Sequence, residues 1–245
     1  MPTTLILDPQ ACAGAETAVE GDAYRHLFRA RRLGVGDRLR VVDGAGAARW
    51  AEVAAVDRRS GRLRLGDPAP SGEAAYRLEL LVATPKKERA AWLVEKVTEL
   101  GAAAVRFVAS ERSPRSLGAG SLDRLRRVAA AAVEQCGRSR VPEVTGVHAW
   151  EEVPGLLEGV PERWFLHLEA ENAQEERATL RPGNPAGAGA VLIGPEGGWS
   201  EAEAEDLPRL GCRPVHLGER VLRVETAALV AAGMILIGAG DPRPV

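Results

Sequence analysis

Short stretches in which hydrophobic and polar residues alternate fill the first 70 positions of the chain. They lie at Arg38–Val42, Trp50–Val56 and Arg62–Leu65, with the turn Asp43-Gly44 between the first two. Alternation is typical of strands, because successive side chains point to opposite faces of a sheet. The pattern predicts a small β-barrel domain over residues 1–70, and the Pro/Gly/Ser-rich stretch Gly66–Gly72 predicts a linker after it.

From residue 73 to residue 245 the pattern changes to apolar strands that alternate with amphipathic helices. Continuous apolar stretches predict strands at Leu78–Ala83, Val105–Val108, Trp164–Leu168, Val191–Ile193 and Pro214–Leu217. Strands that alternate with helices are typical of a mostly parallel sheet covered on both faces. Residues 73–245 are therefore predicted to form an α/β domain.

Two amphipathic helices are predicted between these strands. Hydrophobic residues three and four positions apart mark them at Lys87–Leu100 and Ser121–Cys136. A glycine follows each one, Gly101 and Gly137, and glycine readily adopts the left-handed conformation that ends a helix.

Two further helices are predicted near the C-terminus. Ser200 and Glu203 have the spacing of a capping box, which begins a helix between the last two strands. Thr226–Gly240 is an uncharged run of 15 residues with three glycines. A bilayer span needs about 20 apolar residues. We therefore expect a buried helix from about Glu225 and no membrane segment.

Composition describes an ordinary folded protein, with 45% hydrophobic and 27% charged residues. The three cysteines (Cys12, Cys136 and Cys212) form no CxxC pair, and the four histidines show no metal-ligand spacing. The N-terminus lacks the basic start and long apolar core of a signal peptide. These features predict reduced thiols, no metal site and a cytoplasmic location.

Charge is unevenly distributed along the chain. Residues 1–150 carry 24 Lys/Arg against 18 Asp/Glu, whereas residues 151–245 carry 8 against 16. Seven arginines lie between positions 112 and 140, and Tyr24–Arg32 mixes basic with aromatic residues. Arginine pairs bidentately with phosphate, so both segments are candidate RNA contacts. The candidates are Arg25, Arg29, Arg32, Arg138 and Arg140; solvated surface charge is the alternative.

The sharpest chemical signal is the segment Ile193-Gly-Pro-Glu-Gly-Gly-Trp-Ser200. It follows a predicted buried strand and precedes a capped helix, the place where α/β proteins bind ligands. Glycines there let backbone N–H groups approach a ligand closely. The segment matches neither a Walker loop nor a dinucleotide fingerprint. A tight turn that merely caps a helix stays open as an alternative.

A second glycine-bearing loop, His216–Ala227, follows the next predicted strand. It carries two charged residues, Arg223 and Glu225, where an apolar helix is about to begin. We expect the two loops to form one pocket, suited to a nucleoside-like cofactor held by backbone groups. Simple solvation of a helix end is the alternative for the two charges.

Together these segments resemble the ribosomal RNA small subunit methyltransferase E family of the SPOUT superfamily. IGPEGGWS (193–200) and LGERVLRVETAA (217–228) are similar to its C-terminal signature. Further similar segments, in the same order along the chain, are His26–Arg32, Gly36-Asp37, Asp43-Gly44, Lys86–Gly101, Ser110–Ser113 and Glu134–Pro142. Several independent motifs in one order make the resemblance specific.

The resemblance implies an N-terminal PUA-like β-barrel that binds RNA, followed by a SPOUT-type α/β domain with a C-terminal trefoil knot. It further implies a homodimer that transfers a methyl group from S-adenosylmethionine to N3 of one uridine of 16S ribosomal RNA in the small subunit. By position in the motifs, the implied cofactor-binding residues are Leu168, Gly194, Pro195, Glu196, Gly197, Leu217, Gly218 and Leu222.

Arg223 and Glu225 are the implied catalytic residues of the same signature. As a hypothesis, Arg223 stabilises negative charge that develops on a uracil carbonyl oxygen, and Glu225 or water accepts the N3 proton. The chain departs from the family at Val224, where threonine is usual between this arginine and glutamate. Any role of that hydroxyl is absent here.

Two other functions remain open on the sequence. A non-catalytic RNA-binding or ribosome-assembly protein could use the barrel and the basic helix without a working pocket. A nucleotide-dependent enzyme of a doubly wound fold, unrelated to RNA, is the third reading. The missing phosphate-binding fingerprints count against it.

Overall fold

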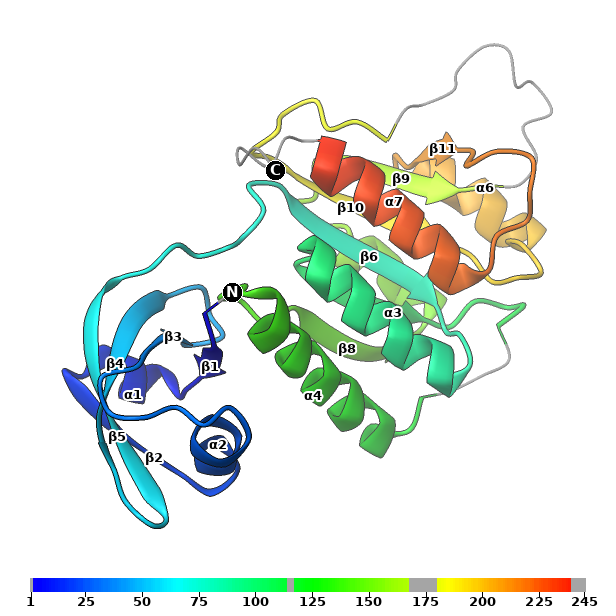
Figure 1. Ribbon diagram of the computed structural model, residues 1–245. Helices are drawn as coiled ribbons and strands as arrows, with labels where there is room; N and C mark the ends of the chain where they lie inside the picture. The colour runs from blue at the N-terminus through cyan, green and yellow to red at the C-terminus, as the bar shows by residue number, and fades with distance from the viewer. Residues whose placement is uncertain (1, 114–116, 168–179, 239–245) are drawn as a thin grey trace. The chain divides into compact units, whose positions relative to one another are not determined.

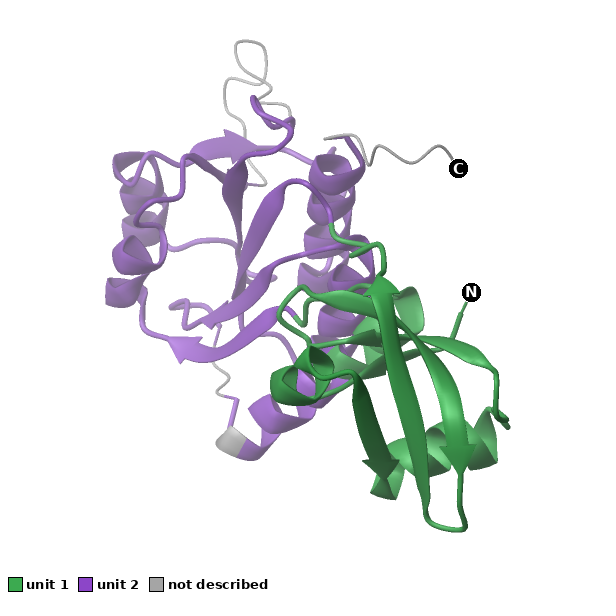
Figure 2. Ribbon diagram, turned by 90° about the vertical axis from the view of Figure 1, so that its left-hand side faces the viewer, with its two compact units in different colours: residues 1–73, 130–141 green, residues 74–129, 142–245 purple. Residues whose placement is uncertain are grey.

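A computed structural model describes residues 2–113, 117–167 and 180–238. The chain divides into two compact units. The first comprises residues 1–73 and 130–141, and the second comprises residues 74–129 and 142–245 (Figure 2). Helix α4 (Ala119–Cys136) contributes residues to both units.

The first unit is built around a five-stranded sheet in the order β1-β3-β4-β5-β2. Its strands are β1 (Thr4–Ile6), β2 (Glu16–Glu20), β3 (Arg38–Val42), β4 (Ala48–Val56) and β5 (Ser60–Pro68). Its short helices are α1 (Pro9–Ala13), α2 (Gly21–Tyr24) and the π-helix η1 (Arg25–Ala30). β1 pairs with β3 in parallel, and the other neighbours are antiparallel. The sheet order leaves β1 and β2 at opposite edges, so the sheet is a half-barrel (Figure 1).

Alternation along the strands produces the core of this unit. In β5 the side chains of Leu63 and Leu65 are buried, whereas Arg62 and Arg64 between them are exposed. The predicted strands are confirmed, with β4 and β5 longer than expected. The first three residues of the predicted linker, Gly66–Pro68, belong to β5.

The segment 130–141 is held within the first unit by a buried ion pair. The carboxylate of Glu73 accepts hydrogen bonds from the guanidinium of Arg138 (2.7 Å) and from the backbone N–H groups of Ser139 (2.9 Å) and Arg140 (2.8 Å). Only 4% of the Arg138 side chain is exposed. A buried pair of this kind is costly to break, because it leaves an uncompensated charge.

The second unit contains a six-stranded, fully parallel sheet in the order β11-β9-β10-β6-β7-β8. The strands are β6 (Arg77–Ala83), β7 (Ala104–Val108), β8 (Glu143–His148), β9 (Glu162–Leu166), β10 (Ala188–Ile193) and β11 (Arg213–Val215). The other elements are α3 (Lys87–Leu100), the 3₁₀ turn η2 (Trp150–Glu152), α5 (Val153–Leu156), α6 (Glu201–Arg209) and α7 (Val224–Gly238).

Helices cover both faces of this sheet (Figures 1 and 2). On one face α7 packs against α3, β6 and β10. On the other, Leu81 and Leu192 of the strands pack with Leu157, Leu207 and Trp199. Burial on both faces explains why the strands read as continuous apolar runs.

The predicted helices and strands of this unit are confirmed, with boundary differences of a few residues. α4 begins two residues before Ser121, and Gly101 ends α3 in the left-handed conformation, with φ +106°. β8 and α5 were not predicted. Leu168, predicted to end a strand, lies outside the described residues. Among the described helices, none combines the length and apolar character needed to cross a bilayer.

Candidate functional site

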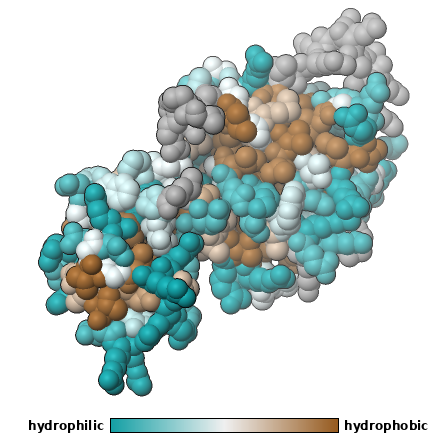
Figure 3. Space-filling model, in the orientation of Figure 1, coloured by the Kyte–Doolittle hydropathy of each residue, from teal (hydrophilic) through white to brown (hydrophobic). Residues whose placement is uncertain are grey.

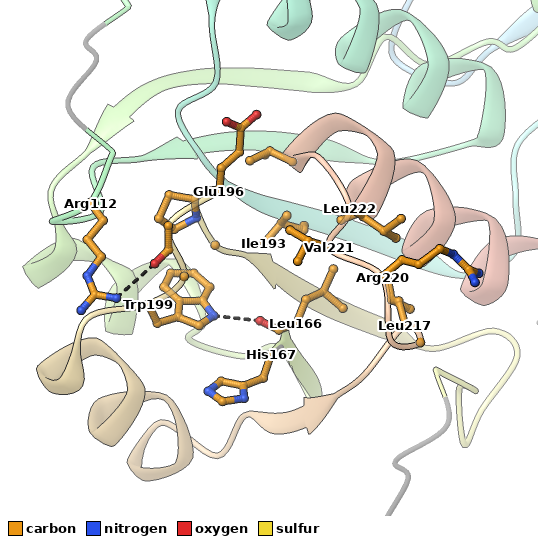
Figure 4. A pocket seen from close by; sticks show the side chains of 17 residues that line it. Arg112, Leu166, His167, Ile193, Glu196, Trp199, Leu217, Arg220, Val221 and Leu222 are labelled. Atoms are coloured by element: carbon orange, nitrogen blue, oxygen red, sulfur yellow. Dashed lines mark hydrogen bonds between the residues drawn. The ribbon is translucent and has the colours of Figure 1, made fainter. Parts of the chain in front are cut away.

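A cavity of about 220 Å³ opens at the carboxyl ends of the central strands of the second unit (Figure 4). Four segments line it: the end of β9, the loop between β10 and α6, the loop between β11 and α7 with the start of that helix, and Arg112 from the segment after β7. β9 lies between β10 and β11 in the sheet. The two glycine loops predicted from the sequence therefore face one cavity, on either side of the end of β9.

The first loop is a tight turn packed against a tryptophan. The N–H of Gly198 donates to the carbonyl of Pro195 at 2.9 Å. A Cβ at Gly194 would lie 2.8 Å from the ring of Trp199, so only glycine fits there. Within the described ranges, the N–H groups of Glu196 and Gly197 have no hydrogen-bond partner. The turn thus contributes two backbone donors that no described residue satisfies, in a loop that lines the cavity.

Trp199 joins this loop to the neighbouring strand. Its Nε1–H donates to the carbonyl of Leu166 at 2.9 Å, and its ring lies 5.6 Å from that of Trp150 (Figure 4). Ser200 then begins α6 with the predicted capping box, in which the Ser200 side chain accepts from the N–H of Glu203. Trp199 therefore holds the end of β9 and the start of α6 together beside the cavity.

The second loop contributes mainly apolar side chains. Leu217, Val221 and Leu222 line the cavity together with Ile193 (Figure 4). Gly218 has φ +105°, a backbone conformation that a residue with a side chain rarely adopts. Flat apolar walls with free backbone donors suit a heterocyclic base, which needs both stacking and edge hydrogen bonds.

Arg89 of α3 connects the two loops. Its guanidinium donates to the carboxylate of Glu196 in the first loop, and its Nε lies 3.4 Å from Glu225 Oε1 at the start of α7. Only 10% of the Glu225 side chain is exposed. The other oxygen, Glu225 Oε2, is buried and has no hydrogen-bond partner among the described residues.

Two further arginines line opposite sides of the cavity (Figure 4). Arg112 donates to the carbonyl of Gly197 at 3.1 Å. Arg220 lies in the second loop, and no hydrogen bond or ion pair joins its side chain to another described residue. Arg112 and Arg220 therefore place two positive charges at the cavity, beside the carboxylate of Glu196, and these arginines can contact an anionic substrate.

The predicted cofactor residues are brought together. Those that line the cavity are Gly194, Pro195, Glu196, Gly197, Leu217, Gly218 and Leu222. Leu168 lies outside the described residues. The proposed catalytic pair does not itself line the cavity: Arg223 is exposed, Glu225 is buried, and Val224 between them lines it.

The cofactor residues assigned from the sequence did not include ten of the lining residues: Arg112, Leu166, His167, Ile193, Gly198, Trp199, Arg220, Val221, Val224 and Ala227. Seven of these ten lie within the two motifs at 193–200 and 217–228, and that proximity was the available signal. From the sequence, Arg112 is one of the seven arginines at 112–140 and part of the family-like motif Ser110–Ser113, and neither feature places it at the cofactor cavity. Its place at the cavity depends on a loop after β7 that is distant in sequence from both motifs.

The predicted RNA contacts lie in the first unit and differ in exposure. Arg25, Arg29, Arg32 and Arg140 are exposed. Arg29 also lies over the ring of Tyr24, 5.7 Å from its centroid. Arg138, in contrast, is buried and paired with Glu73. An RNA contact by Arg138 would require that ion pair to break, so the geometry favours a structural role for it.

Among the described residues, no three His, Cys, Asp or Glu side chains gather in a way that could hold a metal ion.

Two family models match the chain. The model of an RNA methyltransferase domain matches residues 72–236, and that of an RNA methyltransferase PUA domain matches residues 19–66. The first match covers well over half of the chain and includes both loops that line the cavity. The class of protein is therefore an RNA methyltransferase.

Similar proteins show which family of RNA methyltransferases the chain belongs to. The chain is 31% identical to the ribosomal RNA small subunit methyltransferase E of Mycobacterium bovis, over 91% of this chain and 86% of the relative. It is 28% identical to the protein of the same name from Synechocystis, over 96% and 77% of the two chains. The chain belongs to the ribosomal RNA small subunit methyltransferase E family.

A solved structure of the same kind of protein has the same fold. It is the ribosomal RNA small subunit methyltransferase E of Neisseria gonorrhoeae bound to S-adenosyl methionine, with a TM-score of 0.79 and 24% identity. The match covers 95% of this chain and 96% of that one. The predicted arrangement of a PUA-like domain followed by an α/β methyltransferase domain is thereby confirmed.

Proposed function

We propose that this protein transfers a methyl group from S-adenosylmethionine to N3 of a specific uridine in 16S ribosomal RNA of the small subunit. The observation that carries the proposal is the convergence of the two glycine loops on one cavity within the matched methyltransferase domain. Relatives named ribosomal RNA small subunit methyltransferase E support the substrate class. A cytoplasmic location follows from a ribosomal substrate.

The N-terminal and C-terminal parts of the chain would have different roles in this reaction. We assign RNA binding to a domain of residues 1–70 and methyl transfer to a domain of residues 73–245. The trefoil knot at the C-terminus stays a prediction from the family resemblance.

The cavity fits the proposed cofactor in three respects. The free N–H groups of Glu196 and Gly197 can donate to the edge of an adenine ring. Ile193, Leu217 and Leu222 offer apolar surface to its faces. The Neisseria gonorrhoeae relative binds S-adenosyl methionine, and the fold is shared. When bound, the cofactor supplies an electrophilic methyl group on a sulfonium.

Methyl transfer to uracil N3 forms a carbon–nitrogen bond, breaks a carbon–sulfur bond and releases the N3 proton. Positioning supplies much of the acceleration of such an in-line displacement. Arg223 is exposed at the start of α7, and no hydrogen bond or ion pair joins its guanidinium to another described residue. It can therefore approach a uracil carbonyl oxygen and stabilise the charge that develops there.

Glu225 is the candidate to accept the N3 proton. One of its carboxylate oxygens pairs with Arg89, while the other has no partner among the described residues. A buried acceptor without a donor is costly, and a proton or a ligand donor would satisfy it. Water is the alternative base. Val224 places a side chain without a hydroxyl between the two residues.

The direct test uses small ribosomal subunits purified from cells that lack this methylation. They are incubated with labelled S-adenosylmethionine, and the RNA is digested for nucleoside mass spectrometry. The proposal expects 3-methyluridine that depends on enzyme and cofactor. Label in a different nucleoside would refute the uridine-N3 assignment. Cofactor binding without any labelled RNA would favour the non-catalytic alternative.

RNA affinity is expected to depend on the exposed arginines of the first unit. Arg140→Gln removes an exposed positive charge and should weaken RNA binding with a shallower salt dependence. Arg138→Gln breaks the buried pair with Glu73 and should mainly lower stability. A salt titration of RNA binding together with thermal unfolding separates the two. Equal salt slopes in wild type and Arg140→Gln would remove Arg140 from the RNA contact.

We further propose a homodimer formed through α7. Val230, Met234 and Ile237 are 37%, 46% and 69% exposed and recur at helical spacing on this helix. Figure 3 shows hydrophobic residues gathered over α7. Such a stripe normally faces a partner. Met234→Glu should shift the molar mass measured by light scattering towards the monomer, whereas Val35→Glu, an exposed position in the first unit, should not.

A further inference from the structure

Glu203 is a buried carboxylate that accepts three hydrogen bonds. Its Oε2 accepts from the backbone N–H of Ser200 at 2.9 Å and from the hydroxyl of Ser110 at 3.1 Å. Its Oε1 accepts from the backbone N–H of Glu111 at 2.9 Å. Only 3% of the residue is exposed. Two backbone N–H groups and one hydroxyl thus converge on this single carboxylate.

Capping of α6 explains only part of this arrangement. A capping box needs the reciprocal bonds between Ser200 and Glu203 at the start of the helix. The other two donors come from Ser110 and Glu111, more than 90 positions earlier in the chain. The carboxylate therefore joins α6 to the segment that follows β7.

That segment, Ser110–Ser113, is held at two more places. The hydroxyl of Ser113 donates to the carbonyl of Thr84, at the end of β6, at 2.9 Å. Arg112 donates to the carbonyl of Gly197 in the first glycine loop at 3.1 Å. The segment thus connects the buried Glu203 with the wall of the cavity.

The bond from Arg112 acts on a particular peptide group. The carbonyl of Gly197 accepts from Arg112, and the N–H of the same peptide, on Gly198, donates to Pro195. Both polar atoms of that peptide group are therefore occupied. The two preceding N–H groups, of Glu196 and Gly197, are the ones without a partner in the described ranges. The two bonds therefore fix the orientation of the 197–198 peptide group within a loop that lines the cavity.

We infer that Glu203 is a positioning residue for methyl transfer. Its carboxylate holds the Ser110–Ser113 segment in place, and Arg112 of that segment in turn keeps the 194–198 loop in its cofactor-binding conformation. The inference rests on the proposed function, because it assigns the loop to S-adenosylmethionine. A loop already in its bound conformation loses less conformational freedom on binding, so affinity rises without any new contact. Glu203 itself lies outside the set of residues that line the cavity.

The test compares two substitutions on the same helix. Glu203→Gln keeps the shape of the side chain but turns an NH₂ group towards a donor. Glu201→Gln removes the same charge from the first turn of α6 at an exposed position, so it controls for the effect of charge on the helix end. Binding of S-adenosylmethionine is measured by calorimetry, and folding is checked by thermal unfolding.

Glu203→Gln should weaken cofactor binding about tenfold, the equivalent of one lost hydrogen bond to a charged group. Glu201→Gln should stay within about twofold of wild type. In steady-state assays, the KM for the cofactor should rise in Glu203→Gln. The kcat at saturating cofactor and the KM for small subunits should change little. A purely structural defect would instead lower the active fraction and leave both KM values unchanged.

Ser110→Ala provides a second variant that is less disruptive to folding. It removes one donor to Glu203 and should weaken cofactor binding in the same direction by a smaller factor. Because both residues act through one contact, the double variant should show less than the sum of the two free-energy changes.

Outcomes separate this inference from the proposed function. Cofactor affinity of folded Glu203→Gln within twofold of wild type would overturn the inference while the proposed function stands. The same holds if Glu201→Gln loses as much affinity as Glu203→Gln. Failure of the wild type to bind S-adenosylmethionine would overturn both.

Discussion

The parallel sheet of the second unit differs at its two ends. At the amino end, polar side chains satisfy one another: the hydroxyl of Tyr76 donates to Glu162 Oε2 at 2.8 Å, and Glu162 Oε1 accepts from the N–H of Gly183 at 2.8 Å. At the carboxyl end, the N–H groups of Glu196 and Gly197 have no partner within the described residues. One end is closed by internal hydrogen bonds, and the other is left able to bind a ligand.

Ion pairs show the same difference. Near the amino end, Arg106 lies 2.9 Å from Glu79 and 2.9 Å from Glu143, which connects three neighbouring strands. Near the carboxyl end, Arg89 connects two loops, and Arg220 and Arg223 have no ion-pair partner among the described residues. Unpaired cations stabilise the fold little but can contact an anionic substrate. Ion pairs that join strands thus lie near the amino end of the sheet, and the arginines without an ion-pair partner among the described residues lie near its carboxyl end.

The largest effect is expected from Arg223→Ala at the carboxyl end. Loss of a group that stabilises charge in the transition state should lower kcat about 10²–10³-fold. The Kd for S-adenosylmethionine should change much less, because the cavity walls remain. Single-turnover methylation and calorimetry measure the two quantities, with the exposed Arg181→Ala as a control. Unchanged turnover would remove Arg223 from the mechanism.

Gly194→Ala tests the cofactor loop. The added methyl group would lie 2.8 Å from the Trp199 ring, so the ring or the loop must move. We expect cofactor binding to weaken by about tenfold or more, together with a loss of about 1–3 kcal/mol in the free energy of unfolding. Gly155→Ala, with open space around the new methyl group, is the matched control. Wild-type affinity in Gly194→Ala would contradict the packing argument.

Gly189→Ala makes the corresponding change at the amino end of the same strand. The new Cβ would collide with the Tyr76 hydroxyl and lie 2.7 Å from the Trp164 ring. Stability should fall by about 1–3 kcal/mol, whereas the folded variant should bind the cofactor as wild type does. Urea unfolding and calorimetry check both parts. If this variant lost affinity as Gly194→Ala does, the two ends would not be independent.

The smallest effect concerns the pH dependence of stability. Burial and the hydrogen bond to Glu162 raise the pKa of Tyr76 above its ordinary value of 10.0. Above about pH 10 the unfolded chain releases this proton while the folded protein retains it, so stability falls as pH rises, by about 1.4 kcal/mol per pH unit. Tyr76→Phe should lose less stability than wild type between pH 9.5 and about 10.5. Parallel pH profiles of the two proteins would contradict this assignment.

Much of the fold was readable from hydrophobic periodicity. Alternation predicted β3 to β5, and the change to continuous apolar strands with amphipathic helices predicted the parallel sheet. The periodicity did not predict polar or short helices and strands. η1 has the rare π-helical form, and β8 (Glu143–His148) has too few apolar residues to show a clear pattern. Tertiary packing, rather than local preference, holds such elements in place.

Arg138 illustrates what a local reading of charge cannot show. In the sequence it is one of a dense set of arginines, and density of charge suggested RNA. In the structure its partner is Glu73, 65 positions earlier. Pairing across that separation is decided by the fold, since no local pattern connects the two residues. Arg140, two positions later, is exposed.

From the amino-acid sequence came most of the longer helices and strands, the order of the two parts, the two glycine loops and, through the motifs, the family. These depend on residue periodicity and turn chemistry, which act over a few neighbouring positions. The tertiary structure was needed to show which residues share the cavity with those loops, such as Leu166, His167 and Arg112. It also decided that Glu203 connects α6 with a segment more than 90 positions away. Contacts between distant segments depend on how strands are ordered in the sheet, and that order is a property of the folded chain.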